Sequence, residues 1–289
     1  MKEILKVEKL NKTYPKFSLK DVSFSINSGE IMGFVGRNGA GKTTTLKSVM
    51  NLLHVDSGTV VAFGKDMKMF ELENKQKIGF ALSEINYYPN RTIRQMADVT
   101  KRFYKNFSEE TFAKACSLFK LDPSKKLDEL SSGMKVKYSV AIALSHDAQL
   151  LILDEPTSGL DPLSRDEILD IFRELVKKKD RAILFSTHIT SDLDKCATHI
   201  TYIHDGSIKF TGTKKDFLNT YLFVKDKIND SKLLDKFISY KDIDGVIEGL
   251  ILSKDKKEYE TKGIKTSNPD LDQVLIYLER STDYEKFTL

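Results

Sequence analysis

The chain has 289 residues, of which 40% are hydrophobic and 30% are charged, and its formal net charge is +4. This composition is typical of a soluble globular protein, and the sequence has no apolar run of the ~18 residues that a membrane-spanning helix needs. The basic residues are scattered, which gives no reason to expect a nucleic-acid partner, and the first residues lack the apolar core of a secretion signal, so we expect a cytosolic protein. Cys116 and Cys196 lie far apart in apolar surroundings, which predicts buried free thiols.

Two segments near the N-terminus, residues 4–10 and 19–26, alternate apolar with polar residues. This alternation predicts half-exposed antiparallel strands. Residues 11–15 between them predict a turn that contains Tyr14. A tyrosine at such a place either packs against its neighbours or stacks on a purine face, and the residue type alone favours packing.

The central motif is GRNGAGKTT at residues 36–44, which fits the phosphate-binding pattern GxxxxGK[ST]. The apolar run 31–35 predicts a buried strand before it, and the apolar periodicity of 44–53 predicts a helix after it. A chance glycine-rich turn is the alternative, and these flanks argue against it. The glycines allow successive N–H groups to point inward, while the helix N-terminus adds the positive end of its dipole.

In a loop of this kind, Lys42 reaches the β- and γ-phosphates and the Thr43 hydroxyl ligates Mg²⁺. The predicted nucleotide contacts from the loop are Gly36, Asn38, Gly39, Gly41, Lys42, Thr43 and Thr44.

Residues 57–64 and 78–82 predict two further strands, and residues 83–90 predict a loop after them. From 92 to 146 the apolar periodicity is helical. Within that range Ser108, which two glutamates follow, predicts the N-cap of a helix. We therefore expect a helical insertion here.

Asp154 and Glu155 follow the wholly apolar run 150–153, which predicts a central strand. Because parallel sheets bind ligands at the carboxyl ends of their strands, Asp154 would hold Mg²⁺ there and Glu155 would orient and deprotonate an attacking water. Taken alone, such a pair is equally typical of a plain loop start or a helix cap. Beside a phosphate loop it indicates hydrolysis. Asp161 and Pro162 predict the start of the next helix.

His188 directly follows the apolar strand predicted at 182–186. It would contact a γ-phosphate or position water, although a single histidine is more often a satisfied polar residue. A hairpin is predicted at 200–210, around Asp205-Gly206. Helices that alternate with apolar strands predict an α/β fold with a largely parallel sheet and added antiparallel strands.

The character of the chain changes from about residue 221. Residues 225–230 resemble a linker, and the remainder gives short strand and helix signals at 246–252 and 271–278. We expect a small structural or docking appendage. The expected organisation is a nucleotide-binding domain at 1–220, with its helical subdomain at about 85–147, and a small α+β extension at 221–289.

Residues 1–215 together resemble the nucleotide-binding subunit of an ABC transporter, in the form found in exporters of the ABC-2 type. Besides the phosphate loop and the run 150–155, the matching features are the signature sequence LSSGM at 130–134, the D-loop at 158–161, His188 as the switch histidine and Tyr14 as the adenine-stacking aromatic.

The resemblance implies the ABC ATPase core of the P-loop NTPase fold, with ATP and Mg²⁺ as its ligands. It also implies a dimer that holds two nucleotides between its subunits. Ser131 and Gly133, at the start of a helix, would then contact the γ-phosphate that the opposite chain holds, and Asp161 would communicate across the interface.

One position departs from the family pattern. Ser83 stands where the Q-loop glutamine is usual, and Glu84 follows it. Serine is too short to reach both the metal and the membrane-facing loop, so either Glu84 or a water takes over this role, or coupling is looser. An acid near this point and a methionine at position 134 of the signature are two further features in which the chain resembles exporters of the ABC-2 type.

The predicted function is therefore that of an ATPase subunit of an exporter, docked as a dimer on separate transmembrane subunits at the cytoplasmic face of the membrane. The region 85–107 offers the groove for a coupling helix, and an amphipathic or toxin peptide, or an antibiotic, is the favoured cargo. Import of a solute is the runner-up direction. The alternative class is a soluble ABC ATPase that acts on a ribosome or DNA or serves as a nucleotide switch, although a pure switch has no need of Glu155.

Overall fold

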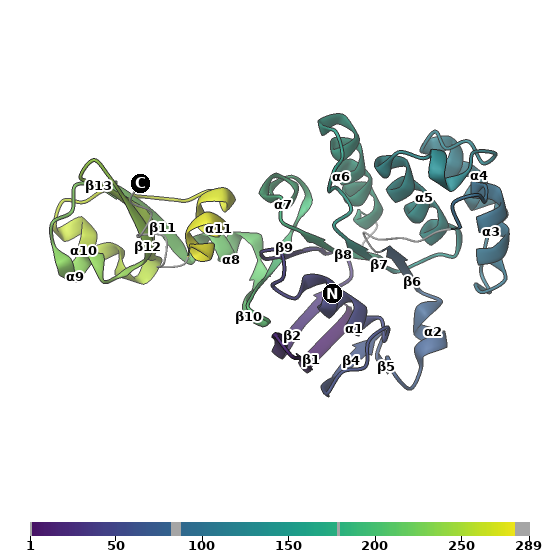
Figure 1. Ribbon diagram of the computed structural model, residues 1–289, viewed down its shortest axis with the longest axis horizontal. Helices are drawn as coiled ribbons and strands as arrows, with labels where there is room; N and C mark the ends of the chain where they lie inside the picture. Colours follow the sequence, from purple (N-terminus) through teal and green to yellow (C-terminus); the bar gives the residue numbers. More distant parts are fainter. Residues whose placement is uncertain (1, 82–87, 178–179, 281–289) are drawn as a thin grey trace. The chain divides into compact units, whose positions relative to one another are not determined.

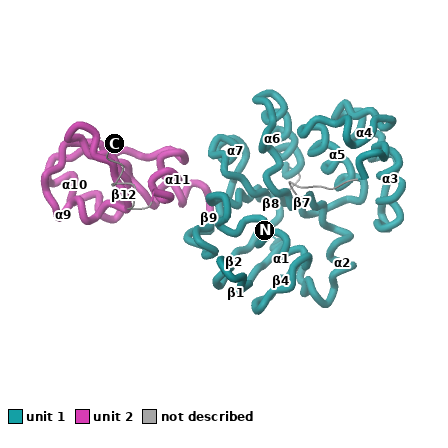
Figure 2. The backbone as a smooth tube through the Cα atoms, in the orientation of Figure 1, with its two compact units in different colours: residues 1–211 teal, residues 212–289 magenta. Residues whose placement is uncertain are grey.

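The computed structural model describes residues 2–81, 88–177 and 180–280. The chain divides into two compact units, residues 1–211 and 212–289 (Figure 2). Within the described ranges, none of the helices combines the length and the apolar character needed to cross a bilayer.

A six-stranded sheet forms the centre of unit 1, in the order β10-β9-β3-β8-β7-β6. The five strands from β9 to β6 pair in parallel, and β3, β7 and β8 are buried along their whole length. Strands covered on both faces require continuous apolar runs, which explains their sequences. In chain order the strands are β3 (Ile31–Val35), β6 (Ile78–Ala81), β7 (Leu150–Asp154), β8 (Ala182–Thr187), β9 (His199–His204) and β10 (Ser207–Thr213).

A second sheet, antiparallel and in the order β2-β1-β4-β5, lies on one side of the central sheet (Figure 1). The helix α1 (Lys42–Val49) buries Leu46 and Val49 in a core shared by both sheets, where the rings of Phe24 and Phe34 lie 5.3 Å apart. The remaining elements of this layer are β1 (Glu3–Tyr14), β2 (Phe17–Asn27), β4 (Ser57–Ala62), β5 (Lys65–Asp66) and α2 (Glu71–Lys75).

Helices α5 (Ser132–Ser145), α6 (Pro162–Val176) and α7 (Thr190–Cys196) cover the opposite face of the central sheet (Figure 1). Phe172 of α6 packs on Phe185 of β8, with ring centroids 5.9 Å apart. The contact between α5 and β6 is close because Gly79 has no side chain: a Cβ there would lie 2.4 Å from the Cβ of Ala143.

The helical periodicity from 92 to 146 corresponds to α3 (Ile93–Lys101), α4 (Glu109–Leu118), the 3-10 helix η1 (Leu127–Glu129) and α5. Ser108 is the N-cap of α4, as predicted, and its hydroxyl accepts a hydrogen bond from the Thr111 N–H at 3.1 Å. His146 follows α5 and stacks on Tyr104, with ring centroids 3.8 Å apart.

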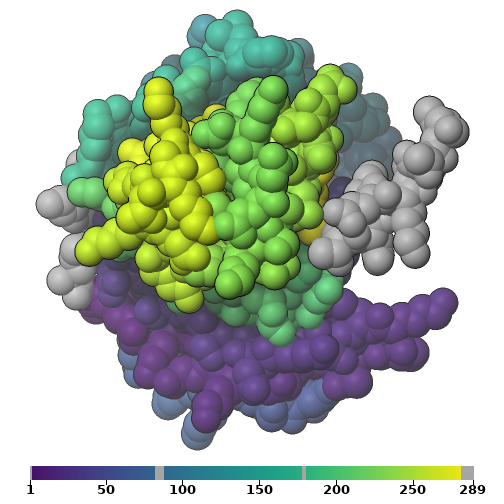
Figure 3. Space-filling model, turned by 90° about the vertical axis from the view of Figure 1, so that its left-hand side faces the viewer, coloured from purple at the N-terminus to yellow at the C-terminus, as the bar shows by residue number. Residues whose placement is uncertain are grey.

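Unit 2 contains an antiparallel sheet in the order β12-β13-β11-β14, and its atoms appear in green and yellow in Figure 3. Its core includes Tyr259, whose buried hydroxyl donates to the carbonyl of Leu233 at 2.7 Å. The elements are α8 (Lys214–Asn219), β11 (Tyr221–Asp226), α9 (Ser231–Leu234), β12 (Phe237–Ile243), β13 (Val246–Leu252), the 3-10 helix η2 (Ser253–Asp255), α10 (Lys256–Thr261), β14 (Thr266–Ser267) and α11 (Leu271–Glu279).

The linker expected at 225–230 is wrong at its first two residues. Lys225 and Asp226 belong to β11, where they pair with Glu248 and Ile247 of β13. The helix α8 belongs to unit 2, whereas the expected extension began only at 221.

Candidate nucleotide-binding site

The phosphate loop connects β3 to α1, in the strand, loop and helix order that the motif requires. Gly39 and Gly41 have φ values of 84° and 111°, a left-handed region that disfavours other residues. A Cβ on Gly36 would lie 2.3 Å from the carbonyl oxygen of Ile203, whereas a Cβ on Gly39 would meet nothing within 4 Å. The loop is therefore pressed on β9 at one end and open at its tip, where Asn38 is exposed.

Lys42 is buried at the start of α1, with 6% of its surface exposed. Its ammonium donates to the carbonyl oxygens of Gly36 at 2.8 Å and Arg37 at 3.2 Å, and it lies 3.3 Å from Oε1 of Glu155. The positive charge therefore lies between the phosphate loop and the end of β7.

Asp154, the last residue of β7, is 2% exposed and lies across from α1. Its Oδ2 accepts a hydrogen bond from the Thr43 hydroxyl at 2.9 Å, and its Oδ1 accepts one from the Ser186 hydroxyl at 2.6 Å. A hydroxyl and a carboxylate on adjoining elements are the oxygen donors that Mg²⁺ prefers, so this pair fits the ion. Thr44 follows within α1.

Glu155 has a backbone φ of 51°, which is uncommon for a residue with a side chain. Its N–H donates to Oγ of Ser186 at 2.8 Å, so the same hydroxyl that binds Asp154 also holds the backbone of Glu155. Strained backbone that its surroundings hold in place is frequent at functional sites. Here it turns the carboxylate of Glu155 toward Lys42 and His188.

His188 lies directly after β8, and its Nδ1 is 2.8 Å from Oε2 of Glu155. The imidazole is 45% exposed, whereas the carboxylate is 15% exposed. The two predicted catalytic residues are thus in direct contact, at the adjoining carboxyl ends of two parallel strands.

Tyr14 ends β1 and is 37% exposed, and the ammonium of Lys12 lies 5.5 Å from its ring centroid. Its strand partner Phe17 lies against the phosphate loop, since a Cβ on Gly41 would be 2.8 Å from Cζ of Phe17. The turn between β1 and β2 is therefore beside the loop. The sequence interpretation missed Phe17, whose only signal is an aromatic residue three positions after Tyr14.

Ser131 is the N-cap of α5 and its hydroxyl accepts from the Met134 N–H at 3.3 Å, so the signature begins a helix as expected. Gly133 lies beside the start of α6: a Cβ there would be 3.4 Å from Cβ of Ser164. Asp161 is the exposed N-cap of α6. Its carboxylate accepts from the N–H groups of Leu163 and Ser164, and the hydrogen bonds to Ser164 are the main reason why its pKa is lowered.

Glu84, and with it the question of the Q-loop position, lies outside the described residues. Ser186 is the second residue that the sequence interpretation missed. Its signal is a hydroxyl at the end of an otherwise apolar strand, next to Thr187 and His188.

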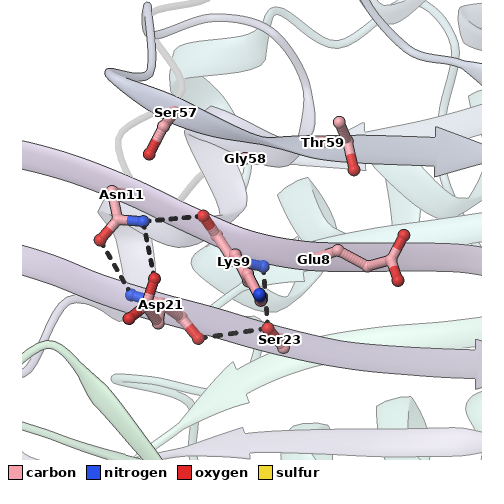
Figure 4. Close-up of a pocket in the computed structure, with 8 residues that line it drawn as sticks. All are labelled: Glu8, Lys9, Asn11, Asp21, Ser23, Ser57, Gly58 and Thr59. Atoms are coloured by element: carbon pink, nitrogen blue, oxygen red, sulfur yellow. Dashed lines mark hydrogen bonds between the residues drawn. The ribbon is translucent and has the colours of Figure 1, made fainter.

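A separate pocket of about 550 Å³ lies on the antiparallel sheet, and none of its lining residues belongs to the phosphate loop (Figure 4). The amide of Asn11 donates to the Lys9 carbonyl at 2.8 Å and to Oδ1 of Asp21 at 3.0 Å, while Lys9 and Asp21 have left-handed backbones. These bonds stabilise irregular pairing of β1 with its neighbours. The lining residues are Glu8, Lys9, Asn11, Asp21, Ser23, Ser57, Gly58 and Thr59.

Comparison with known proteins identifies the family. The profile described as ABC transporter matches residues 19–158, a range that begins in β2 and ends after Glu155. The chain is 33% identical over 190 residues to the ABC transporter ATP-binding protein YtrB of Bacillus subtilis (strain 168), an alignment that covers 66% of this chain and 65% of YtrB. This is just under two thirds of the length of that relative.

The bacitracin transport ATP-binding protein BcrA of Bacillus licheniformis is 32% identical over 72% of this chain and 69% of its own length. A solved structure described as the ATP-binding subunit of an ABC transporter has 27% identity and a TM-score of 0.67, and the match covers 74% of this chain and 91% of that one. The predicted fold class is thereby confirmed. The chain belongs to the ABC transporter family, in the class of its ATP-binding subunits.

Proposed function

We propose that the chain hydrolyses Mg-ATP as a motor subunit of an exporter, working as a dimer on transmembrane permease subunits of the ABC-2 type at the cytoplasmic face of the membrane. The observation that carries the proposal is the contact between Glu155 and His188 beside the pair formed by Thr43 and Asp154. This arrangement brings together a general base (Glu155), the histidine that orients it, and the two expected metal ligands.

In this site, Lys42 and the N–H groups of the phosphate loop bind the β- and γ-phosphates, while Tyr14 stacks on the adenine. Thr43 and Asp154 would hold Mg²⁺, with Glu84 as a further candidate. When bound, Mg²⁺ supplies positive charge that offsets the charge developing on the phosphate oxygens.

Glu155 accepts a proton from the attacking water, and His188 keeps its carboxylate in place. Because Lys42 lies 3.3 Å from Glu155, the γ-phosphate and the carboxylate compete for one ammonium group. Binding of the phosphate draws the ammonium away and leaves Glu155 free to act as a base. Ser131 and Gly133 of the second subunit complete the γ-phosphate site, and Asp161 lies at that interface.

The permease is proposed to dock on the helical subdomain. Tyr88, Val99 and Phe103 are large side chains in and around α3 that are 71%, 44% and 70% exposed. Exposed apolar side chains of this size, when they lie close together, mark a protein-binding surface. A coupling helix with an apolar face fits such a surface.

The cargo proposed is an amphipathic or toxin peptide, or an antibiotic, which is supported by the bacitracin transport protein among the relatives. Import of a solute is the alternative direction, and a soluble nucleotide switch is the alternative class.

The test is to purify the chain with the product of any adjacent gene that encodes a polytopic membrane protein, and to measure Mg-dependent ATP hydrolysis of the complex. We expect the chain to co-purify with the membrane protein, and we expect the transported substrate to stimulate ATP hydrolysis. An active chain that associates with ribosomes or DNA and with no membrane protein would favour the soluble alternative.

A further inference from the structure

Asp192 lies in α7, outside the residues assigned above, yet it is fully buried and contacts two segments of the site. Its Oδ2 accepts a hydrogen bond from the hydroxyl of Thr157, and the hydroxyl of Thr187 lies 3.5 Å from the same oxygen. Thr157 follows Glu155 by two positions, and Thr187 directly precedes His188. One carboxylate oxygen therefore joins the segments that carry the base and the histidine.

The other oxygen of Asp192 faces α6. Its Oδ1 lies 3.9 Å from Nε of Arg165, and each of these two atoms is buried without a hydrogen-bond partner among the described residues. Buried polar atoms are nearly always paired, so two unpaired atoms that face each other require an explanation. A movement of about 1 Å would bring them to the usual N–H···O distance of about 2.9 Å.

These contacts enclose the segment that carries Asp161. Thr157 lies before Asp161 in the chain, and Arg165 lies after it, where its N–H donates to the Asp161 carbonyl at 3.0 Å. Asp161 itself is exposed. The carboxylate of Asp192 thus contacts both ends of the segment 157–165, whose middle faces solvent.

We propose that Asp192 is a positioning residue that fixes the segment 157–165 relative to Glu155 and His188. The Arg165–Asp192 contact closes to a hydrogen-bonded ion pair when the second subunit engages this segment. The proposal rests on the proposed function, because it assumes that a dimer forms on ATP and that Glu155 is the base.

Electrostatics supports this arrangement. Burial raises the pKa of Asp192 above its usual value, the hydrogen bond from Thr157 and the charge of Arg165 oppose this rise, and the charge of Glu155 adds to it. A buried carboxylate whose ion pair is incomplete is unfavourable, and closing the pair with Arg165 removes part of that penalty. The free energy gained on closure would therefore favour the engaged form of the segment.

The test compares the wild-type chain with Asp192→Asn, Thr157→Val and the double variant. Asparagine keeps the size and the acceptor for Thr157 but cannot form an ion pair with Arg165. We expect each single variant to lower kcat at least tenfold while the affinity of the isolated monomer for Mg-ATP stays within about twofold. The double variant should be no slower than the slower single variant, because residues that act as one unit are not additive.

A second measurement follows ATP-induced dimerisation in the Glu155→Gln background, where Asp192→Asn should raise the ATP concentration required several-fold. The matched control is Asp170→Asn, which removes an exposed carboxylate paired with Arg173 on the same helix as Arg165 and should change nothing.

Three results would overturn the inference: a wild-type kcat in Asp192→Asn, losses that multiply in the double variant, or a fall in kcat accompanied by equal losses of ATP binding and thermal stability. The last result would show a merely structural role. A wild-type chain without Mg-dependent hydrolysis would instead refute the proposed function, so the two failures are distinguishable.

Discussion

Nδ1 of His188 and Oε2 of Glu155 lie 2.8 Å apart, so the residues that follow β7 and β8 are joined by a hydrogen bond. The same carboxylate is 3.3 Å from the ammonium of Lys42 through its other oxygen. Glu155 therefore lies between a histidine that orients its carboxylate and a lysine whose ammonium group would bind the phosphates of ATP. Several consequences of this arrangement can be measured.

Replacing Glu155 by glutamine should lower kcat by about 10²- to 10⁴-fold, the usual contribution of a general base, while ATP still binds. His188→Ala should lower kcat less, by about tenfold or more, because the base remains but is no longer oriented. Steady-state hydrolysis and nucleotide-binding titrations separate the two effects. Glu174→Gln, which changes an exposed acid paired with Lys177, is the control. Normal turnover of Glu155→Gln would remove this residue from the role of base.

A mixed dimer tests whether each site is shared between chains. With Lys42→Ala in one chain and Ser131→Arg in the other, both defects fall in one site, and the second site should still retain ATP. With both substitutions in the same chain, each site receives one defect and both should fail. Counting the nucleotides retained per dimer in the Glu155→Gln background distinguishes these outcomes. The opposite pattern would show that each chain builds its own site.

Ser186→Ala should weaken both the proposed Mg²⁺ site and the stability of the fold. The substitution removes the donor to Asp154 and leaves the N–H of Glu155 unpaired, which costs about 1–3 kcal/mol for a buried group. We expect a lower melting temperature and a kcat reduced about tenfold, with a higher Mg²⁺ requirement. Ser145→Ala is a matched control, because the Ser145 side chain is also buried but its hydroxyl donates within α5, to the Ala141 carbonyl. An unchanged Mg²⁺ requirement in Ser186→Ala would contradict the role given to this hydroxyl.

His146 should make the protein sensitive to acid. Burial lowers the pKa of its imidazole below the usual value, and a hydrogen bond to the Gln76 carbonyl at 3.1 Å opposes this only in part. The unfolded chain therefore takes up a proton at higher pH than the folded one. The stabilisation is present above the unfolded pKa of about 6.5 and is lost as the pH falls below it.

The measurement is thermal unfolding at about pH 7.5 and 5.5, above and below the unfolded pKa of about 6.5. His146→Gln should lose less stability between these values than the wild type does, whereas His54→Gln, at an exposed position, should behave like the wild type. Equal pH dependence in all three proteins would show that other groups control the acid sensitivity.

Phe103→Ser should reduce binding of the permease without lowering the ATPase activity of the isolated chain, because the side chain is 70% exposed and distant in sequence from every catalytic residue. Leu118→Ser, at a 73% exposed position of α4, is the matched control. Pull-down of the permease and hydrolysis by the free subunit are the two readouts. Equal loss of binding in both variants would argue against a docking surface at α3.

The sequence predicts the parts of the site that depend on local order. A buried strand, a glycine-rich loop and an amphipathic helix are adjacent in the chain, so their pattern can be recognised without knowledge of the fold. The same holds for Asp154 and Glu155, which directly follow the apolar residues of β7 in the chain. Helix caps such as Ser108 and Asp161 are also local, since each bonds a backbone group within three residues.

Contacts that depend on strand register were not predicted. Ser186 meets Asp154 because β7 and β8 pair in parallel with these two residues in register, and 32 positions separate them in the chain. The role of Asp192 likewise arises from the packing of α7 against two loops. The local hydrophobic periodicity of a sequence does not predict such a non-local contact.

Unit 2 shows the same limit. Its strand β12 is half-buried or exposed along its length, and β14 has only two residues. Neither strand therefore shows a strong alternation of apolar and polar residues. The polar end of β11 resembles a linker in sequence because the stabilising partner, β13, lies about twenty residues further along the chain. Non-local pairing overrides local composition in such strands.

Because Gly79 and Ala143 are in close contact, a small rotation of α5 about this point would displace the other end of the helix. Ala143 is near the C-terminal end of the helix, where it touches β6, and Ser131 lies at the other end, ~18 Å away at a rise of 1.5 Å per residue. A tilt of about 10° about the contact at Ala143 would displace the N-terminal end of α5 by about 3 Å over a helix of this length. In the proposed dimer, small rotations at the sheet would thus be amplified at the signature, so a larger residue at position 79 should misalign a site that it does not touch.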